Sequence, residues 1–251
     1  MSYPVIIESM TDSLDNRVEW AYIGEVDYLT ALHLQRELWR RVLSNDDRSG
    51  FLLLCEHRPV ITIGRFGKET NILLSKGDLK KRGIEVHRIE RGGDVTFHGP
   101  GQLVGYPIVN LRDFKLGARS YVHLLEETLI AVLRGFGIQG GRIEGYPGVW
   151  IGEEKIAAIG VYVKRLITMH GFSLNVNTDL GFFSLIVPCG IRRMGVTSMK
   201  RVTGKEFPLK DVALILVNEF GKTFKADMKA THVSERDKVA ILRRLGGSSG
   251  V

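Results

Sequence analysis

The pattern of apolar and polar residues along the chain predicts several amphipathic helices. Leu34, Leu38 and Val42 recur at a spacing that places them on one face of a helix, with Gln35 on the side expected to meet solvent. Asp27 stands where it would cap that helix. The helices predicted in this way cover residues 28–43, 78–81, 120–136, 210–220 and 234–245.

Short apolar runs bounded by turn residues predict strands between these helices. Such runs occupy part of the first 25 residues and then 51–56, 60–63, 84–89, 108–109, 148–152, 156–163 and 168–176. A glycine-containing turn joins two of them, 148–152 and 156–163, into a predicted hairpin. Because no repeat, linker or low-complexity block divides the chain, we expect a single domain over 1–251, of the α+β or mixed α/β class, with a flexible tail at 246–251.

Composition narrows the class of protein. The 251 residues are 44% hydrophobic and 25% charged, which is typical of a globular domain. The net charge of +7 favours an acidic partner, but the lysines and arginines are scattered and form no basic run, so nucleic-acid binding is disfavoured. No stretch of about 18 apolar residues and no signal-like start is present, so we expect a cytoplasmic protein with no membrane contact.

The stretch from Arg91 to Pro107, R-G-G-D-V-T-F-H-G-P-G-Q-L-V-G-Y-P, concentrates glycines and polar side chains between two apolar runs. Glycines let a backbone approach a ligand closely, and Arg91, Asp94, His98 and others supply polar groups beside them. The stretch therefore predicts one wall of an active site. A glycine-rich hairpin that only turns the chain is the alternative.

The two cysteines have different surroundings. Cys55 lies inside an apolar run and is expected to be a small buried residue with an inert thiol. Cys189 lies between Pro188 and Gly190, in a predicted turn where nearby positive charge would lower its pKa and favour the reactive thiolate. A half-buried loop cysteine is the alternative. Nothing in the cysteine spacing indicates a disulfide framework or a zinc site.

Lys155 begins a predicted strand that is otherwise apolar and small. A lysine at a strand end usually extends its ammonium group into water. Over a packed strand that bears a glycine, it can instead point into a cleft and influence a neighbouring group. The sequence leaves both possibilities open.

Four motifs, in this order and spacing, resemble the lipoyl(octanoyl) transferase family. They are the Arg91 stretch, K-I-A-A-I-G from Lys155, H-G-F-S-L-N-V from His170 and P-C-G-I from Pro188. The segment L-L-L-C-E-H-R-P-V-I-T-I-G-R from Leu52 resembles the same family, so the likeness extends over about 28–199.

The resemblance implies a fold like the catalytic domains of lipoate and biotin protein ligases, with a mixed sheet flanked by helices. It also implies transfer of an octanoyl group from acyl carrier protein to a lysine of a lipoyl domain, without metal, ATP or another cofactor. The acceptors implied are the lipoyl domains of 2-oxoacid dehydrogenases and the glycine cleavage H protein.

Carried over position by position, the resemblance makes Cys189 the nucleophile that becomes an acyl thioester. Lys155 becomes the group that lowers the pKa of the thiol and moves protons, for which its own pKa would need lowering by an apolar pocket. Ser173 stands where alanine is usual in the family, which adds a hydroxyl group to the expected acyl pocket. The acyl-binding positions implied are Arg91, Gly92, Gly93, Asp94, Val95, Thr96, Phe97, His98, Ala158, Ile159, Gly160, Gly171, Phe172 and Ser173.

Two other functions compete with this one. An ATP-dependent lipoate or biotin protein ligase shares the fold, the glycine-rich segment and a similar lysine, but it activates its acid as an adenylate and has no need of Cys189. A non-catalytic module that binds acyl groups or nucleic acid is the second alternative, suggested by the pI of 9.4.

Overall fold

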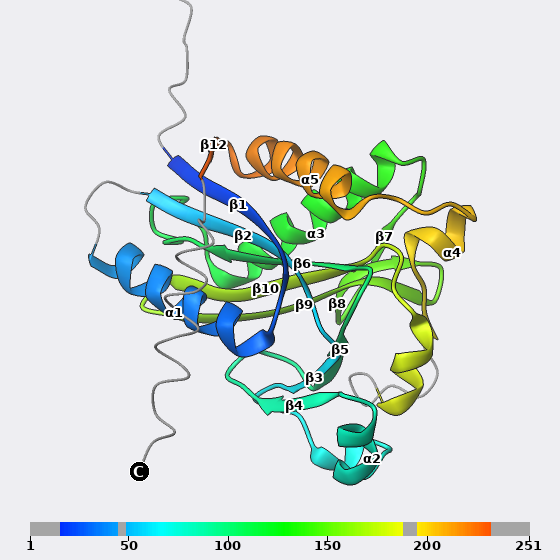
Figure 1. Ribbon diagram of the computed structural model, residues 1–251. Helices are drawn as coiled ribbons and strands as arrows, with labels where there is room; N and C mark the ends of the chain where they lie inside the picture. Colours follow the sequence, from blue (N-terminus) through cyan, green and yellow to red (C-terminus); the bar gives the residue numbers. More distant parts are fainter. Residues whose placement is uncertain (1–15, 45–48, 188–194, 232–251) are drawn as a thin grey trace, which may run out of the picture.

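A computed structural model describes residues 16–44, 49–187 and 195–231 (Figure 1). Most of the strands form one large mixed sheet. Its members are β1 (Asn16–Val26), β2 (Ser49–His57), β6 (Gln102–Ile108), β7 (Gly141–Ile143), β8 (Tyr146–Ile151), β9 (Glu154–Lys164), β10 (Ile167–Asn175), β11 (Gly195–Val196) and β12 (Ala226–Ala230). The order is β12-β1-β2-β6-β10-β9-β8-β7, with β11 paired to β9. β1 is parallel to β2 and β12, whereas the pairs from β2 through β7 are antiparallel.

A small second sheet contains β3 (Val60–Ile63), β4 (Glu85–Arg88) and β5 (Val95–His98), in the order β4-β3-β5. This sheet changes the interpretation of the Arg91 stretch. β5 belongs to the small sheet and β6 to the large one, and the two strands do not pair. The alternative of a plain hairpin is therefore wrong, because this stretch carries the chain from one sheet to the other.

Helices cover both faces of the large sheet (Figure 1). α3 (Ala118–Gly135) and α5 (Leu209–Phe224) pack against each other and share a core with β2, β6, β9 and β10, in which Leu54, Leu103 and Leu129 are buried. α1 (Tyr28–Ser44) covers the opposite face and packs on β10 and β6. The short elements are α2 (Lys76–Lys81), α4 (Met199–Thr203) and the 3-10 helices η1 (Glu69–Asn71) and η2 (Leu180–Leu185).

The predicted helices are found with small shifts at their ends. Asp27 accepts the Thr30 amide at 2.9 Å and so caps α1 as expected. α3 begins two residues before the predicted Ser120, because Gly117 takes the N-cap position. The predicted helix 234–245 and the tail 246–251 lie outside the described residues.

Gln35 contradicts the prediction for α1. It was expected on the solvent side, yet its side chain is buried and accepts the backbone N–H of His170 at 3.0 Å. This contact joins residues 135 positions apart, so helical spacing alone gives no sign of it. Among the described residues, no helix is both long and apolar enough to cross a membrane.

Candidate active site

A cavity of about 580 Å³ lies where the Arg91 segment, β9 and β10 meet. This volume is within the range of small-molecule sites. The wall combines backbone of the glycine-rich segments with aromatic and apolar side chains. The lining residues are Tyr28, Phe66, Arg91, Gly92, Gly93, Asp94, Val95, Thr96, His98, Val104, Tyr106, Val122, Gly145, Tyr146, Pro147, Lys155, Ala158, Ile159, Gly160, Val161, His170, Gly171, Phe172 and Ser173.

Arg91 and Asp94 hold the glycine-rich segment in place. The guanidinium of Arg91 is buried and donates to the Thr62 carbonyl at 2.7 Å, to the Thr62 hydroxyl and to the Gly92 carbonyl. The Asp94 carboxylate accepts the side-chain amide of Asn71 and the backbone N–H groups of Lys68 and Val95. The hydrogen bonds of both charged side chains therefore stabilise the glycine-rich segment and fix its backbone beside the cavity.

Glycines allow this segment and β10 to approach their neighbours closely. The Gly92 amide donates to the Val161 carbonyl of β9 at 2.9 Å. A Cβ at Gly160 would lie 3.1 Å from the Gly92 carbonyl oxygen and 3.1 Å from Arg91 Cδ. A Cβ at Gly171 would collide with the backbone of Gly105. Gly171 is thus required for the backbones to pack at this distance, and at Gly160 a Cβ would make its neighbours shift slightly.

A chain of hydrogen bonds sets the tautomer of His98. The Thr197 carbonyl accepts Asn175 Nδ2 at 2.9 Å, so Asn175 Oδ1 accepts Gln102 Nε2, also at 2.9 Å. Gln102 Oε1 is then the atom 2.7 Å from His98 Nδ1, and only an N–H at Nδ1 satisfies it. Nε2 of His98 therefore carries a lone pair. In this state the ring can accept a hydrogen bond from a substrate but cannot donate one at Nε2.

Two further histidines lie close to His98, and all three are buried. His57 is bonded through Nδ1 to the Val26 carbonyl at 2.8 Å and through Nε2 to the Tyr106 hydroxyl at 2.6 Å. The ring nitrogens of His170 are buried in the cavity wall. Burial lowers the pKa of His57 to about 4, of His98 to about 3 and of His170 to about 4. At neutral pH the three rings are uncharged.

Lys155 lies on the cavity wall at the start of β9 and is half-buried. Its Nζ donates to the Pro147 carbonyl at 3.1 Å and lies 4.6 Å from the centre of the Trp150 ring. The carbonyl and the ring face both favour a cation at this position. Lys155 therefore points into the site instead of extending freely into water.

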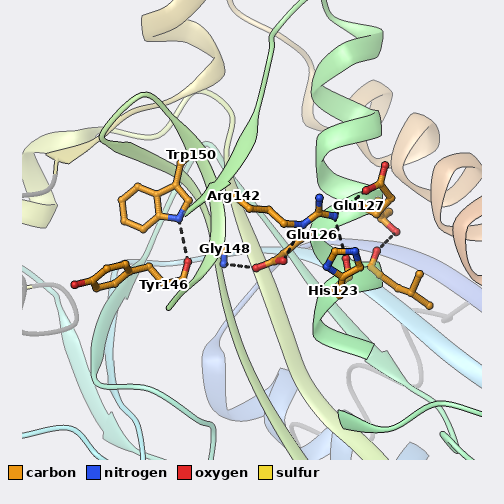
Figure 2. A network of polar contacts seen from close by, with 9 residues as sticks. His123, Glu126, Glu127, Arg142, Tyr146, Gly148 and Trp150 are labelled. Atoms are coloured by element: carbon orange, nitrogen blue, oxygen red, sulfur yellow. Dashed lines mark hydrogen bonds and ion pairs between the residues drawn. The ribbon is translucent and has the colours of Figure 1, made fainter. Parts of the chain in front are cut away.

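Glu126 bonds to Gly148 of β8 and to Arg142 (Figure 2). Its carboxylate, on α3, accepts the Gly148 amide at 2.9 Å and Arg142 Nε at 3.0 Å. Arg142 also donates to Glu127 at 2.7 Å and to the His123 carbonyl. Gly148 follows Pro147, so a buried carboxylate on a helix fixes the strand that supplies the carbonyl bonded to Lys155.

The residues predicted for acyl binding come together in the cavity wall, with one exception. Phe97 does not line the cavity; it packs against Phe182 and Phe183 in a separate apolar core. Alternation along β5 explains this, because Thr96 and Phe97 point to opposite faces. Ser173 is buried and lines the cavity, as expected from its place in the motif. Cys189 lies outside the described residues.

Sequence reasoning missed several residues of the site. Tyr28 lines the cavity, and Glu126 lies behind it, but each belongs to a helix with an ordinary apolar pattern. Only the three-dimensional contacts reveal them. Cys55 is buried as expected, and burial raises the pKa of its thiol. In the described part of the chain, no cluster of three or more acidic, histidine or cysteine side chains is arranged to hold a metal ion.

The fold is that of a lipoate or biotin ligase catalytic domain. The chain superposes with a TM-score of 0.73 on lipoate-protein ligase A bound with ATP, at 18% identity over 93% of this chain and 94% of that one. A bipartite lipoate protein ligase from Thermoplasma acidophilum gives 0.70 at 18% identity, covering 93% and 92% of the two chains. The biotin protein ligase of Aquifex aeolicus gives 0.52 at 16% identity, covering 82% and 70%.

Sequence comparison identifies the family. The model of the lipoyl protein ligase A/B catalytic domain matches residues 27–221, and the chain belongs to this family. It is 50% identical to an octanoyltransferase of Caldicellulosiruptor bescii over 89% of this chain and 97% of that one. An octanoyltransferase of Caldanaerobacter subterraneus is 46% identical, over 83% and 91%. The chain is thus an acyltransferase enzyme of the octanoyltransferase type.

Proposed function

We propose that the enzyme transfers an octanoyl group from acyl carrier protein to a lysine of a lipoyl domain, through a thioester on Cys189. The observation that carries this proposal concerns the two ends of the segment 188–194. At one end the Val187 amide donates to the Asn71 carbonyl. At the other, Val196 of β11 pairs with Lys155, and the Thr197 amide donates to the Lys155 carbonyl at 3.0 Å. The described residues on either side of 188–194 are thus bonded to Asn71, whose side chain holds Asp94 of the cavity wall, and to Lys155, which lines the cavity.

The chemistry follows from these groups. The Cys189 thiolate attacks the carbonyl carbon of the donor thioester, the carbon–sulfur bond to the carrier breaks, and the carrier thiol leaves with a proton. The lysine amine of the acceptor then attacks the acyl-cysteine, forming an amide and releasing the Cys189 thiolate. Lys155 takes the thiol proton and so becomes a cation, and it supplies that proton to the carrier thiol as it leaves. As a neutral amine again, Lys155 then accepts the proton that the attacking acceptor amine loses in the second step. Exchange between two thioesters is nearly balanced in energy, so no ATP is required.

The cavity suits the acyl chain. Ala158, Ile159 and Gly160 on β9 and Gly171 on β10 offer small or apolar surface, and the backbone of Gly92 and Gly93 lies alongside them. Lys155 stands on the same wall, so the carbonyl of a bound acyl group would lie at the lysine and its chain along the glycines. Because Nε2 of His98 can only accept a hydrogen bond, it can bind a hydrogen-bond donor, such as the attacking amine.

The nucleophile is tested by intact-mass analysis after mixing the enzyme with octanoyl-acyl carrier protein. Wild type is expected to gain one octanoyl group in a bond that hydroxylamine cleaves, and Cys189→Ala is expected to gain none. Cys55→Ala is the matched control, since the other thiol is buried, and it should load like wild type. A hydroxylamine-labile adduct on Cys189→Ala would refute the nucleophile, and formation of an adenylate from ATP and free octanoate would favour a ligase.

The same assay tests Lys155. Lys155→Ala is expected to slow acyl loading by roughly 10²-fold or more while leaving the unfolding transition intact, because the thiol loses its proton acceptor. Lys164→Ala, at the far end of β9, serves as the control. A Lys155→Ala enzyme that loads at the wild-type rate across neutral pH would exclude the lysine from the mechanism.

A further inference from the structure

An exposed phenylalanine stands at the cavity wall. Phe66 is 73% exposed and lines the cavity, on the loop that follows β3. The loop is tied down by backbone bonds from the Gly64 amide to Asp94, from the Arg65 amide to Arg91 and from the Phe66 amide to Gly93. A large apolar side chain held in water on a well-bonded loop does not serve the core. It has the character of a contact residue for a partner.

The surface beside Phe66 is basic. Residues 65–88 contain seven lysines and arginines against three acidic residues. Each of the three carboxylates has a cationic or histidine partner: Glu69 lies 3.8 Å from both Lys76 and Arg88, Asp78 lies 3.6 Å from Lys81, and Glu85 lies 2.8 Å from His87. Within the described structure, the side chains of Arg65, Lys68, Lys80 and Arg82 have no ion-pair partner, and all four are exposed.

Contacts link the loop of Phe66 to α2. Arg88 on β4 donates to the Gly67 carbonyl at 3.3 Å and faces Glu69, which in turn faces Lys76 at the start of α2. The loop of Phe66 and α2 are thereby linked across the small sheet, at the bottom of Figure 1. We call Arg65, Phe66, Lys68, Lys76, Lys80 and Arg82 the basic rim.

We propose that the basic rim is the docking surface for the acyl donor, an acidic protein that presents its acyl thioester at the cavity. This inference rests on the proposed function and assigns a surface to one of its two partners. The donor is favoured over the acceptor because the acyl chain must pass into the cavity that Phe66 lines, whereas the acceptor lysine has only to reach the thioester. Long-range attraction between the rim and an acidic carrier would raise the rate of encounter.

The test compares a protein donor with a small neutral one. The probes are octanoyl-acyl carrier protein and octanoyl-N-acetylcysteamine thioester, and the readout is the rate at which the full-length enzyme gains mass. Arg65→Glu/Lys68→Glu and, separately, Lys80→Glu/Arg82→Glu are expected to slow loading from the protein donor by roughly tenfold at low salt. Loading from the small thioester should be unchanged. The effect should shrink as salt is added, since screening weakens the attraction in wild type.

The matched control is Arg134→Glu/Lys210→Glu, which reverses the same number of charges on α3 and α5, away from the small sheet. It should load from both donors like wild type. Equal slowing by the control would mean that net charge alone matters, and the rim would be excluded. Rim variants that load normally from the protein donor would also overturn the proposal, as would rim variants impaired only in transfer from the acylated enzyme to a lipoyl domain. If wild type gains no mass from either donor, the proposed function itself fails.

Discussion

At the scale of single residues, the three buried histidines make stability depend on pH. The folded pKa values of His57, His98 and His170, about 4, 3 and 4, lie below the value of about 6.5 in an unfolded chain. At pH values between the folded and the unfolded pKa, the unfolded state binds more protons than the folded state, so acidification favours unfolding. The stability that comes from burying the three uncharged rings is thus fully present above pH 6.5. It is lost progressively as the pH falls toward 4 and then 3.

We therefore expect the free energy of unfolding to fall between pH 7 and pH 5, by on the order of 1–2 kcal/mol for each histidine. Urea titrations at several pH values measure this fall. His57→Asn, which can keep the hydrogen bond to the Val26 carbonyl, should reduce the slope with pH. His123→Gln, at an exposed position, should preserve it. A wild-type stability that does not change over this interval would contradict the assignment of neutral, buried rings.

At the scale of elements, Glu126 couples α3 to the strand that receives Lys155. Glu126→Gln removes the charge that pairs with Arg142 and weakens the acceptor for the Gly148 amide. We expect loading from octanoyl-acyl carrier protein to slow by roughly tenfold, because Pro147 no longer holds the ammonium group of Lys155 in place. The pH profile of loading should shift as well, which a purely structural role would not cause.

Glu127→Gln is the control for this prediction, because the Glu127 carboxylate bonds to the same arginine, whereas it is Glu126 that accepts the Gly148 amide of β8. It should leave both the rate and the pH profile unchanged. If Glu127→Gln slows loading as much as Glu126→Gln, the effect comes from Arg142 and not from the strand β8 that bonds Lys155.

Elements with a strong local pattern could be predicted from the sequence. α1, α3, α5 and the β8–β9 hairpin appear within a few residues of their expected ends, because their apolar spacing is set by the core they face. β12 was not expected, although its residues 226–230 alternate between apolar and polar, and this short segment becomes a strand by pairing with β1. The sequence also did not predict that β5 and β6 lie in different sheets, because a glycine-rich segment can form a hairpin turn as well as a connection between two sheets.

The residues of the site were likewise predicted only in part from the sequence. The motifs identify the glycine segments and Lys155, which the fold brings to one cavity. They also include Phe97, which faces a core instead of the cavity, and they omit Glu126 and Gln35. Gln35 bonds to the amide of His170, a residue with a positive φ of 55°, and such a contact across 135 positions leaves no periodic trace in the sequence.

At the scale of the whole molecule, the cavity depends on how closely the Arg91 segment lies against β9. Gly160→Ala would place a methyl group 3.1 Å from both the Gly92 carbonyl oxygen and Arg91 Cδ, and would push the segment away from the strand. We expect slower acyl loading, by several-fold, together with a lower free energy of unfolding. Kinetics with octanoyl-N-acetylcysteamine thioester and urea titration measure the two effects.

Gly141→Ala is the matched substitution, because a Cβ at Gly141 meets nothing within 4 Å and its backbone does not require a positive φ. It should match wild type in both measurements. Wild-type loading by Gly160→Ala would show that the cavity tolerates a wider gap between these two backbones than the packing indicates.

The burial of Cys55 has a practical consequence for chemistry on the folded enzyme. The chain has two cysteines, and the one in β2 is enclosed by apolar side chains with its thiol held protonated. A thiol reagent that reacts with the native protein therefore reports on position 189, while unfolding exposes the second sulfur. The rise in thiol on denaturation comes from Cys55 and therefore counts the chains. On the proposed mechanism, the thiol that reacts in the native protein counts the chains that do not yet carry an acyl group.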